Sequence, residues 1–206
     1  MPSIVDMFIW LPAILIALTF HEYAHALVAD RLGDSTPYYQ GRLTINPLPH
    51  IDWVGFIMLM LFRFGWAKPV QVNPYNFKNI DIKKGMMLVS LAGPAMNILL
   101  AFVGMVILRI LSPYQYDENI IMVIRLVQPL VQINLILAAF NLIPIPPLDG
   151  SKILAGLLPN SGAQFIYSLE QYGPLFLLLL IFTGAVGTVL YPIVNTLYTL
   201  LYLIVF

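Results

Sequence analysis

The chain has 206 residues, of which 60% are hydrophobic and 10% are charged, and its formal net charge is zero. This composition is far from that of soluble domains and predicts an integral membrane protein. The sequence has no cluster of basic residues of the kind that binds nucleic acid, so no nucleic-acid partner is expected. Cysteine is absent, which excludes disulfides, thiolate metal ligands and cysteine nucleophiles. The length suits a single domain over residues 1–206.

The first predicted element is a membrane-spanning helix over Met7–Ala29. Glu22 is the only formally charged residue in this stretch, and about 20 apolar residues suffice to cross a bilayer as a helix. The residues before it lack the basic segment of a secretory signal, so we expect this helix to stay in the mature protein.

A histidine pair near the end of this helix points to metal chemistry. His21 and His25 lie one helical turn apart on one face, with Glu22 beside them. Two imidazoles at this spacing can hold one zinc ion, and the carboxylate between them is then placed to take a proton from water. Ionisable groups at membrane depth are costly and usually mark a functional site. The H-E-x-x-H pattern therefore predicts a hydrolase.

The segment after the first helix is rich in turn residues and predicts a short structure that enters the membrane and returns. Trp53–Phe62 is apolar but only ten residues long, about 15 Å as a helix against a hydrocarbon core of about 30 Å. Tyr38–Ile45 and Trp66–Val72 have weak strand character. Such strands could hold an extended substrate by edge pairing, or could only pack the loop.

Two further full spans and an apolar C-terminal region follow. Gly85–Leu108 and Ile120–Ile143 are the predicted second and third spans, and Gln171–Phe206 is an uncharged run too long for one untilted span. We expect two short segments there. The predicted fold class is an all-α polytopic membrane protein with about four to six transmembrane helices and a short re-entrant or β-hairpin segment on the cytoplasmic side. Its catalytic core covers about 7–155 and its C-terminal helices 173–206.

The distribution of basic residues predicts the orientation. Seven of the ten Lys and Arg lie between Arg31 and Lys84, which favours a cytoplasmic location for that connection. We therefore expect a protein of the inner (plasma) membrane with its N-terminus outside the cell. His21 then lies toward the cytoplasmic end of its helix. If Trp53–Phe62 does not cross, the third span returns Asp149 to the same side.

A catalytic zinc needs a third protein ligand and an open position for water. Asp149 is favoured on local chemistry because it follows a proline-broken helix end, beside Gly150, on the expected side of the membrane. Four other residues stay open as alternatives: His50, Asp52, Asp30 and Asp117.

Several motifs together resemble the site-2 protease family of intramembrane zinc metalloproteases. These are HEYAH in a membrane helix, NPLPHIDWVG at 46–55, GW with KPV and NP at 65–74, AGPAMN at 92–97 and NLIPIPPLDG at 141–150. The resemblance is to the minimal bacterial and archaeal type, without an inserted PDZ domain or a CBS extension. It implies one zinc ion per chain and hydrolysis of peptide bonds of single-pass transmembrane proteins, within or near the lipid bilayer.

By this resemblance, His21, His25 and Asp149 are the zinc ligands and Glu22 is the general base. Asn141 falls where the family has an asparagine thought to hold the substrate backbone or the developing oxyanion. Gly93, Pro94 and Asn97 match a packing motif without assigned chemistry. A homo-oligomer is compatible with the sequence. The alternatives are a catalytically silent membrane scaffold and a metal or proton transporter, the latter suggested by ionisable groups at membrane depth.

Overall fold

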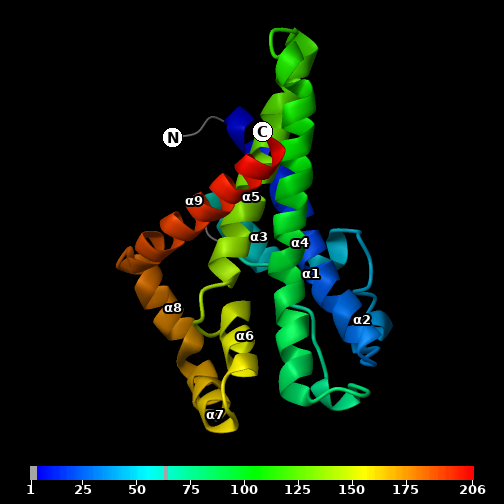
Figure 1. The fold of residues 1–206 in the computed structure, drawn as a ribbon, viewed down its shortest axis with the longest axis vertical. Coiled ribbons are helices and arrows are strands. Elements are labelled where there is room, and N and C mark those ends of the chain that lie inside the picture. The colour runs from blue at the N-terminus through cyan, green and yellow to red at the C-terminus, as the bar shows by residue number, and fades with distance from the viewer. Residues whose placement is uncertain (1–3, 63–64) are drawn as a thin grey trace.

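The structure is a computed structural model that describes residues 4–62 and 65–206. The described part is helical, with short irregular connections (Figure 1). Its α-helices are α1 (Ile4–Arg31), α2 (Thr36–Tyr39), α3 (Trp53–Phe62), α4 (Ile82–Leu111), α5 (Glu118–Asn141), α6 (Asp149–Leu157), α7 (Asn160–Leu169), α8 (Gly173–Phe182) and α9 (Ala185–Val205).

Five stretches of the described chain are long and apolar enough to cross a membrane. They are Phe8–Arg31, Ile82–Tyr114, Glu118–Asn141, Asn160–Phe182 and Ala185–Val205. This agrees with the predicted polytopic all-α class of about four to six spans. The protein is therefore a multi-pass membrane protein.

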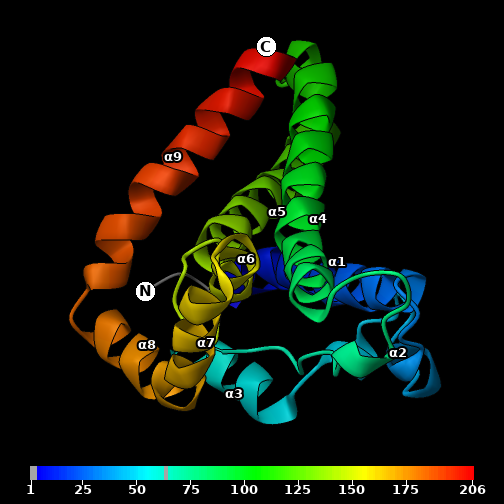
Figure 2. The same cartoon turned by 60° about the horizontal axis from the view of Figure 1, so that its bottom comes forward.

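Helices α1, α4 and α5 pack against one another and form the centre of the protein (Figures 1 and 2). Small residues let their backbones approach closely, as is common between membrane helices. Ala17 of α1, Ala101 of α4 and Ala138 of α5 are fully buried. The polar starts of two helices are set by side-chain caps, because Asp81 accepts from the backbone at the start of α4 and Asp117 does so for α5.

The prediction of strands at Tyr38–Ile45 and Trp66–Val72 is wrong, because neither forms in the described residues. Thr36–Tyr39 forms the short helix α2, where Pro37 suits a first turn. In the described residues the only β-type pairing is a single antiparallel bridge between Ile51 and Ala67.

The backbone of the second predicted strand is paired in other ways. Lys68 donates its amide to the His50 carbonyl and accepts from the Arg42 guanidinium, while Val70 donates to the Glu22 carboxylate. Pro69 has no amide to donate. These partners satisfy the backbone without a ladder, so no hairpin forms in the described residues.

A buried carboxylate organises the connection between α1 and α4. Asp34 is fully buried and accepts from the Asn73 backbone amide at 2.7 Å and from the Asn76 side chain at 2.8 Å. Burial would raise the pKa of Asp34, but hydrogen bonds from Thr36, Asn76 and Asn73 outweigh it and lower that pKa. Asp34 therefore stays ionised and ties the start of this connection to its end.

The C-terminal region bends at a glycine. Gly184 has a φ of +76° and ends α8 before α9 begins, and both views show the two helices meeting at an angle there (Figures 1 and 2). The end of α9 reaches the end of α4, where the Arg109 guanidinium lies 5.3 Å from the centre of the Phe206 ring. The expected pair of C-terminal segments is thus present, although the first membrane-length stretch begins at Asn160 rather than near Gln171.

Candidate metal centre

Three side chains from two distant parts of the sequence converge beneath the C-terminal end of α1. The Nε2 atoms of His21 and His25 are 3.0 Å apart, and each lies 3.2 Å from Oδ2 of Asp149. Among the described residues, these three are the only group of His, Cys, Asp or Glu whose atoms are placed to share a metal ion. The histidines are buried.

Local structure explains how Asp149 reaches α1. It is the first residue of α6, directly after the proline-rich turn that follows α5. A Cβ atom on Gly150 would lie 2.4 Å from the Ile143 carbonyl oxygen and 2.5 Å from that of Leu142. Only glycine permits this close approach of α6 to the end of α5.

The outward-facing nitrogens of both histidines are held by α4. His25 Nδ1 donates to the Val89 carbonyl oxygen at 2.7 Å, and His21 Nδ1 donates to Asn97 Oδ1 at 2.6 Å. Because a carbonyl can only accept, each neutral ring keeps its proton on Nδ1 and presents the Nε2 lone pair to the shared centre.

Asn97 is itself fixed by two further hydrogen bonds. Its amide donates to the Ala17 carbonyl oxygen at 3.1 Å and to Asn134 Oδ1 at 2.8 Å, and Asn134 donates to the Leu130 carbonyl oxygen at 2.8 Å. Both asparagines are fully buried. This chain assigns the Asn97 carbonyl to His21 and connects α1, α4 and α5 through satisfied polar groups.

Gly93 leaves space for the centre. A Cβ atom at this position would lie 2.5 Å from His25 Nε2 and 2.7 Å from His21 Nε2. The backbone of α4 therefore borders the space between the two imidazoles, and any side chain there would fill it.

These observations fit a zinc ion. Zinc bound tetrahedrally at its usual ligand distances separates its ligand atoms by about 3.3 Å, close to the 3.0 and 3.2 Å found here. Two imidazole lone pairs and a carboxylate oxygen would repel one another without a cation between them. The donor set and the space beside Gly93 thus match the needs of a three-ligand zinc site.

Glu22 is held at the side of this cluster by the connection between α1 and α4. Its Oε2 accepts from the Val70 amide at 2.9 Å and lies 4.0 Å from Arg42 Nη2. Both contacts use the same oxygen, so Oε1 takes part in neither. The carboxylate is therefore fixed in one orientation beside the two histidines.

The cluster opens into a cleft of about 490 Å³. Glu22, Asn141 and Asp149 line it, together with Trp66 and Val70 of the α1–α4 connection. Asn141 is the last residue of α5 and donates to the Leu137 carbonyl oxygen at 3.1 Å. The predicted site residues thus share one cavity, which is large enough for a stretch of peptide.

The other third-ligand candidates lie outside the cluster. His50 interacts through Nε2 with the Thr44 carbonyl oxygen at 2.8 Å, and burial lowers its pKa. Asp52 accepts from the Gly55 amide at 2.9 Å, and Asp117 caps α5. Each of these residues orders a turn or a helix start. Asp30 lies in the last turn of α1.

Sequence reasoning assigned no chemistry to Gly93 and Asn97, although both contact the histidines. Their spacing on one helical face of AGPAMN was the available signal, since residues four apart face the same neighbour. Arg42 was counted only as part of the basic connection, and its burial beside Glu22 depends on a loop conformation that no local pattern specifies.

The fold and this centre define a class of protein: a polytopic membrane protein in which two histidines and an aspartate, placed to share a metal ion, lie between the helices. The model of peptidase family M50 matches residues 117–181, which include Asn141 and Asp149. The Bacillus subtilis protein named "Putative zinc metalloprotease YwhC" is 39% identical over 185 residues, covering 88% of this chain and 84% of that protein.

More distant relatives carry similar names. The Methanocaldococcus jannaschii protein named "Putative zinc metalloprotease MJ0611" is 32% identical, over 74% of this chain and 72% of its own length. "Putative zinc metalloprotease Rip2" of Mycobacterium tuberculosis is 30% identical over 81% of this chain and 63% of its own length. No solved structure matches significantly. The chain belongs to peptidase family M50, the site-2 proteases, and is a zinc metalloprotease of that type.

Proposed function

We propose that this protein is an intramembrane protease that hydrolyses peptide bonds of single-pass transmembrane proteins within or near the bilayer, as a step of regulated intramembrane proteolysis. The observation that carries the proposal is the shared cleft, in which Glu22 lies beside His21, His25 and Asp149. His21 is ten residues before the end of α1, about 15 Å along the helix axis. Hydrolysis at this depth acts on segments that soluble proteases do not reach.

His21, His25 and Asp149 would hold one zinc ion per chain, with the fourth position open to water. When bound, the ion would lower the pKa of a water molecule to near 7 and would polarise the scissile carbonyl. Glu22 takes a proton from the attacking water and returns it to the leaving amine. Asn141, which lines the same cleft, would hold the substrate backbone beside the reacting carbonyl.

The centre faces the cytoplasm in this proposal, with the N-terminus outside the plasma membrane. The basic α1–α4 connection borders the cleft through Trp66 and Val70. Within that connection, α3 is ten residues long and exposes Trp53, Val54 and Ile57. We assign α3 as a re-entrant segment on the cytoplasmic side, because it is too short to span and its exposed residues are apolar.

A reporter transmembrane substrate and purified protein test the assignment. Glu22→Gln should retain zinc but lose activity by about 10²- to 10⁴-fold, the usual contribution of a positioned acid or base. Glu118→Gln is the matched control, since Glu118 is exposed at the start of α5. Removing zinc with a strong chelator should stop cleavage, and added zinc should restore it.

Two outcomes would contradict the proposal. Full activity in Glu22→Gln would remove Glu22 from the chemistry. A zinc content that does not fall in His25→Ala or Asp149→Ala would place the ion elsewhere.

A further inference from the structure

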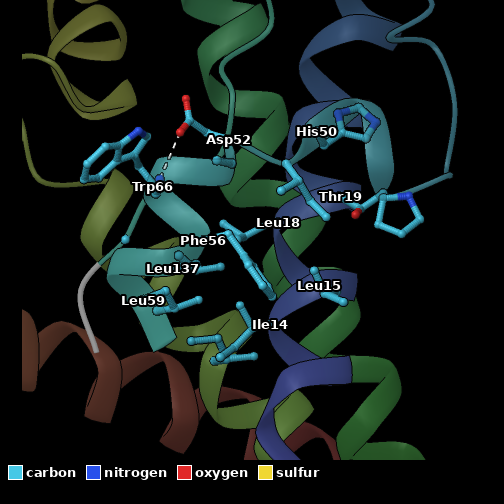
Figure 3. Close-up of a pocket in the computed structure, with 16 residues that line it drawn as sticks. Ile14, Leu15, Leu18, Thr19, His50, Asp52, Phe56, Leu59, Trp66 and Leu137 are labelled. Carbon is cyan, nitrogen blue, oxygen red and sulfur yellow. Dashed lines mark hydrogen bonds between the residues drawn. The ribbon is translucent and has the colours of Figure 1, made fainter. Parts of the chain in front are cut away.

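A second cavity lies beside the metal cleft, on the side toward the N-terminal half of α1. It has a volume of about 100 Å³ and almost wholly apolar walls (Figure 3). Three helices form its walls together with residues of the α1–α4 connection. Ile14, Leu15 and Leu18 come from α1, Phe56 and Leu59 from α3, and Ile133 and Leu137 from α5. Figure 3 shows Phe56 pointing from α3 toward α1.

The two cavities adjoin each other. Both are lined by Leu18 and Leu137 and by the segment Gly65, Trp66 and Ala67. Leu18 is three residues before His21 and Ile14 is seven before it, so all three share one face of α1. The cavity therefore extends from about 4.5 to about 10.5 Å from His21 along the helix axis.

Size and chemistry restrict what the cavity can hold. A protein cavity of about 150 Å³ accommodates benzene, so this cavity of about 100 Å³ suits one branched aliphatic side chain and is too small for an indole. Thr19, His50 and Asp52 also line the cavity, but almost all of its wall area is apolar. A polar side chain would therefore exchange hydrogen bonds to water mostly for apolar contacts. An aliphatic group is the matching ligand.

The position of the cavity indicates which part of a substrate would enter it. Peptide bound for hydrolysis must be unwound, and an extended chain advances about 3.3 Å per residue. A side chain two or three residues from the scissile bond would then lie over this cavity. A whole lipid acyl chain would exceed its volume.

We propose that this cavity is a specificity pocket that binds an aliphatic side chain, of leucine, isoleucine or valine, two or three residues from the scissile bond. The proposal rests on the proposed function, because its ligand is part of the protease substrate. It assigns to α3 the role of forming one wall of a substrate subsite.

The test measures kcat/KM for a reporter transmembrane substrate whose cleavage site has been mapped by mass spectrometry. Each of the four residues on either side of the scissile bond is replaced in turn by Leu, Ala, Asn and Trp. At one position, two or three residues from the bond, Leu should be cleaved more than about tenfold faster than Asn or Trp, as for other pockets that discriminate size and polarity.

Two variants of the wall then move this preference in opposite directions. Phe56→Ala enlarges the cavity, so the Trp-to-Leu ratio at the selective position should rise at least about tenfold. Ile14→Trp fills it, so the Leu substrate should slow to the rate of the Ala substrate. Ile16→Trp is the matched control, since Ile16 lies on the same helix, is exposed and does not line the cavity. Ratios between substrates within one variant do not depend on how much of the protein is folded.

The outcomes separate this proposal from the proposed function. A zinc-loaded chain that cleaves no transmembrane substrate overturns the proposed function and the pocket with it. Cleavage that depends on Glu22 but shows no selective position, or ratios that Phe56→Ala leaves unchanged, overturns the pocket alone. A Phe56→Ala protein whose stability changes with lipid chain length while its ratios stay constant would instead identify a lipid acyl chain as the occupant.

Discussion

The centre of the protein and its C-terminal end are both built from apolar helices, yet they differ in what they bury. Within the most apolar stretch of each span, 44% of α1 and 33% of α4 is buried inside the protein, against 6% of α9. Buried polar side chains follow the same division. His21 and Asn97 are buried in α1 and α4, whereas Asn195 of α9 is exposed.

This difference shows where a membrane protein can keep polar chemistry. A polar group inside the bilayer is costly unless another group satisfies it, and α1, α4 and α5 provide those partners through His21, Asn97 and Asn134. Helix α9 packs one edge against α4 and α5. The chemistry is thus confined to the helices that enclose one another, and matched substitutions in the two regions can test this.

The largest expected effect comes from adding a methyl group beside the two imidazoles. In Gly93→Ala the new Cβ would lie 2.5 Å from His25 Nε2, in the space that the ion needs. Removing one hydrogen-bond partner behind a metal ligand typically lowers affinity by about 10- to 100-fold. A methyl group in the space of the ion itself should cost more, so zinc affinity should fall by more than about 100-fold. Competition with a zinc-binding dye measures this directly.

Gly187→Ala in α9 is the matched control. Apart from the adjoining residues and backbone of α9 itself, no atom of the described residues lies within 4 Å of a Cβ built there, and alanine favours a helix over glycine by up to about 1 kcal/mol. This variant should bind zinc as the parent does. Equal zinc affinity in both variants would contradict the position assigned to the ion.

A smaller effect is expected from the asparagine behind His21. Asn97→Leu removes the acceptor for His21 Nδ1, so zinc affinity should fall about 10- to 100-fold. Asn97→Asp loses the two amide donors but keeps an acceptor oxygen for His21 Nδ1, so it should retain more of the affinity than Asn97→Leu. A purely structural role for Asn97 would not predict this difference. Asn195→Leu, at an exposed position of α9, should change nothing. An Asn97→Asp protein as impaired as Asn97→Leu would contradict the positioning role.

The sequence predicted the parts of this site that depend on short-range periodicity. The membrane helices follow from apolar runs of sufficient length, and His21, Glu22 and His25 share a helix, where spacing determines which residues meet. Asp149 required topology as well as chemistry, because it lies 124 residues after His25. The structure brings it to within 3.2 Å of that histidine, although its role as a ligand stays a prediction.

Loop structure and long-range hydrogen bonds could not be predicted in the same way. Trp66–Val72 has strand-like residues, but its backbone pairs with His50, Arg42 and Glu22 instead of another strand. Propensity describes a local preference that tertiary partners override. Asn97 contacts a histidine 76 residues away, which no local pattern indicates without the packing of α4 on α1.

The smallest expected effect concerns the one edge of α9 that is packed. Leu201 is 8% exposed in a cluster with Ala101, Met105, Val131 and Leu135, whereas Leu203 is 72% exposed. Leu201→Ala should lower the free energy of unfolding by about 1–2 kcal/mol, below the usual cost in a soluble core, because in lipid the loss is mainly one of packing. Leu203→Ala should have no measurable effect. Unfolding in detergent measures both. Zinc affinity should be unchanged in both, since no residue of this cluster lines the metal cleft. Weaker zinc binding in Leu201→Ala would show that α9 shapes the metal centre and that the two regions are not separate.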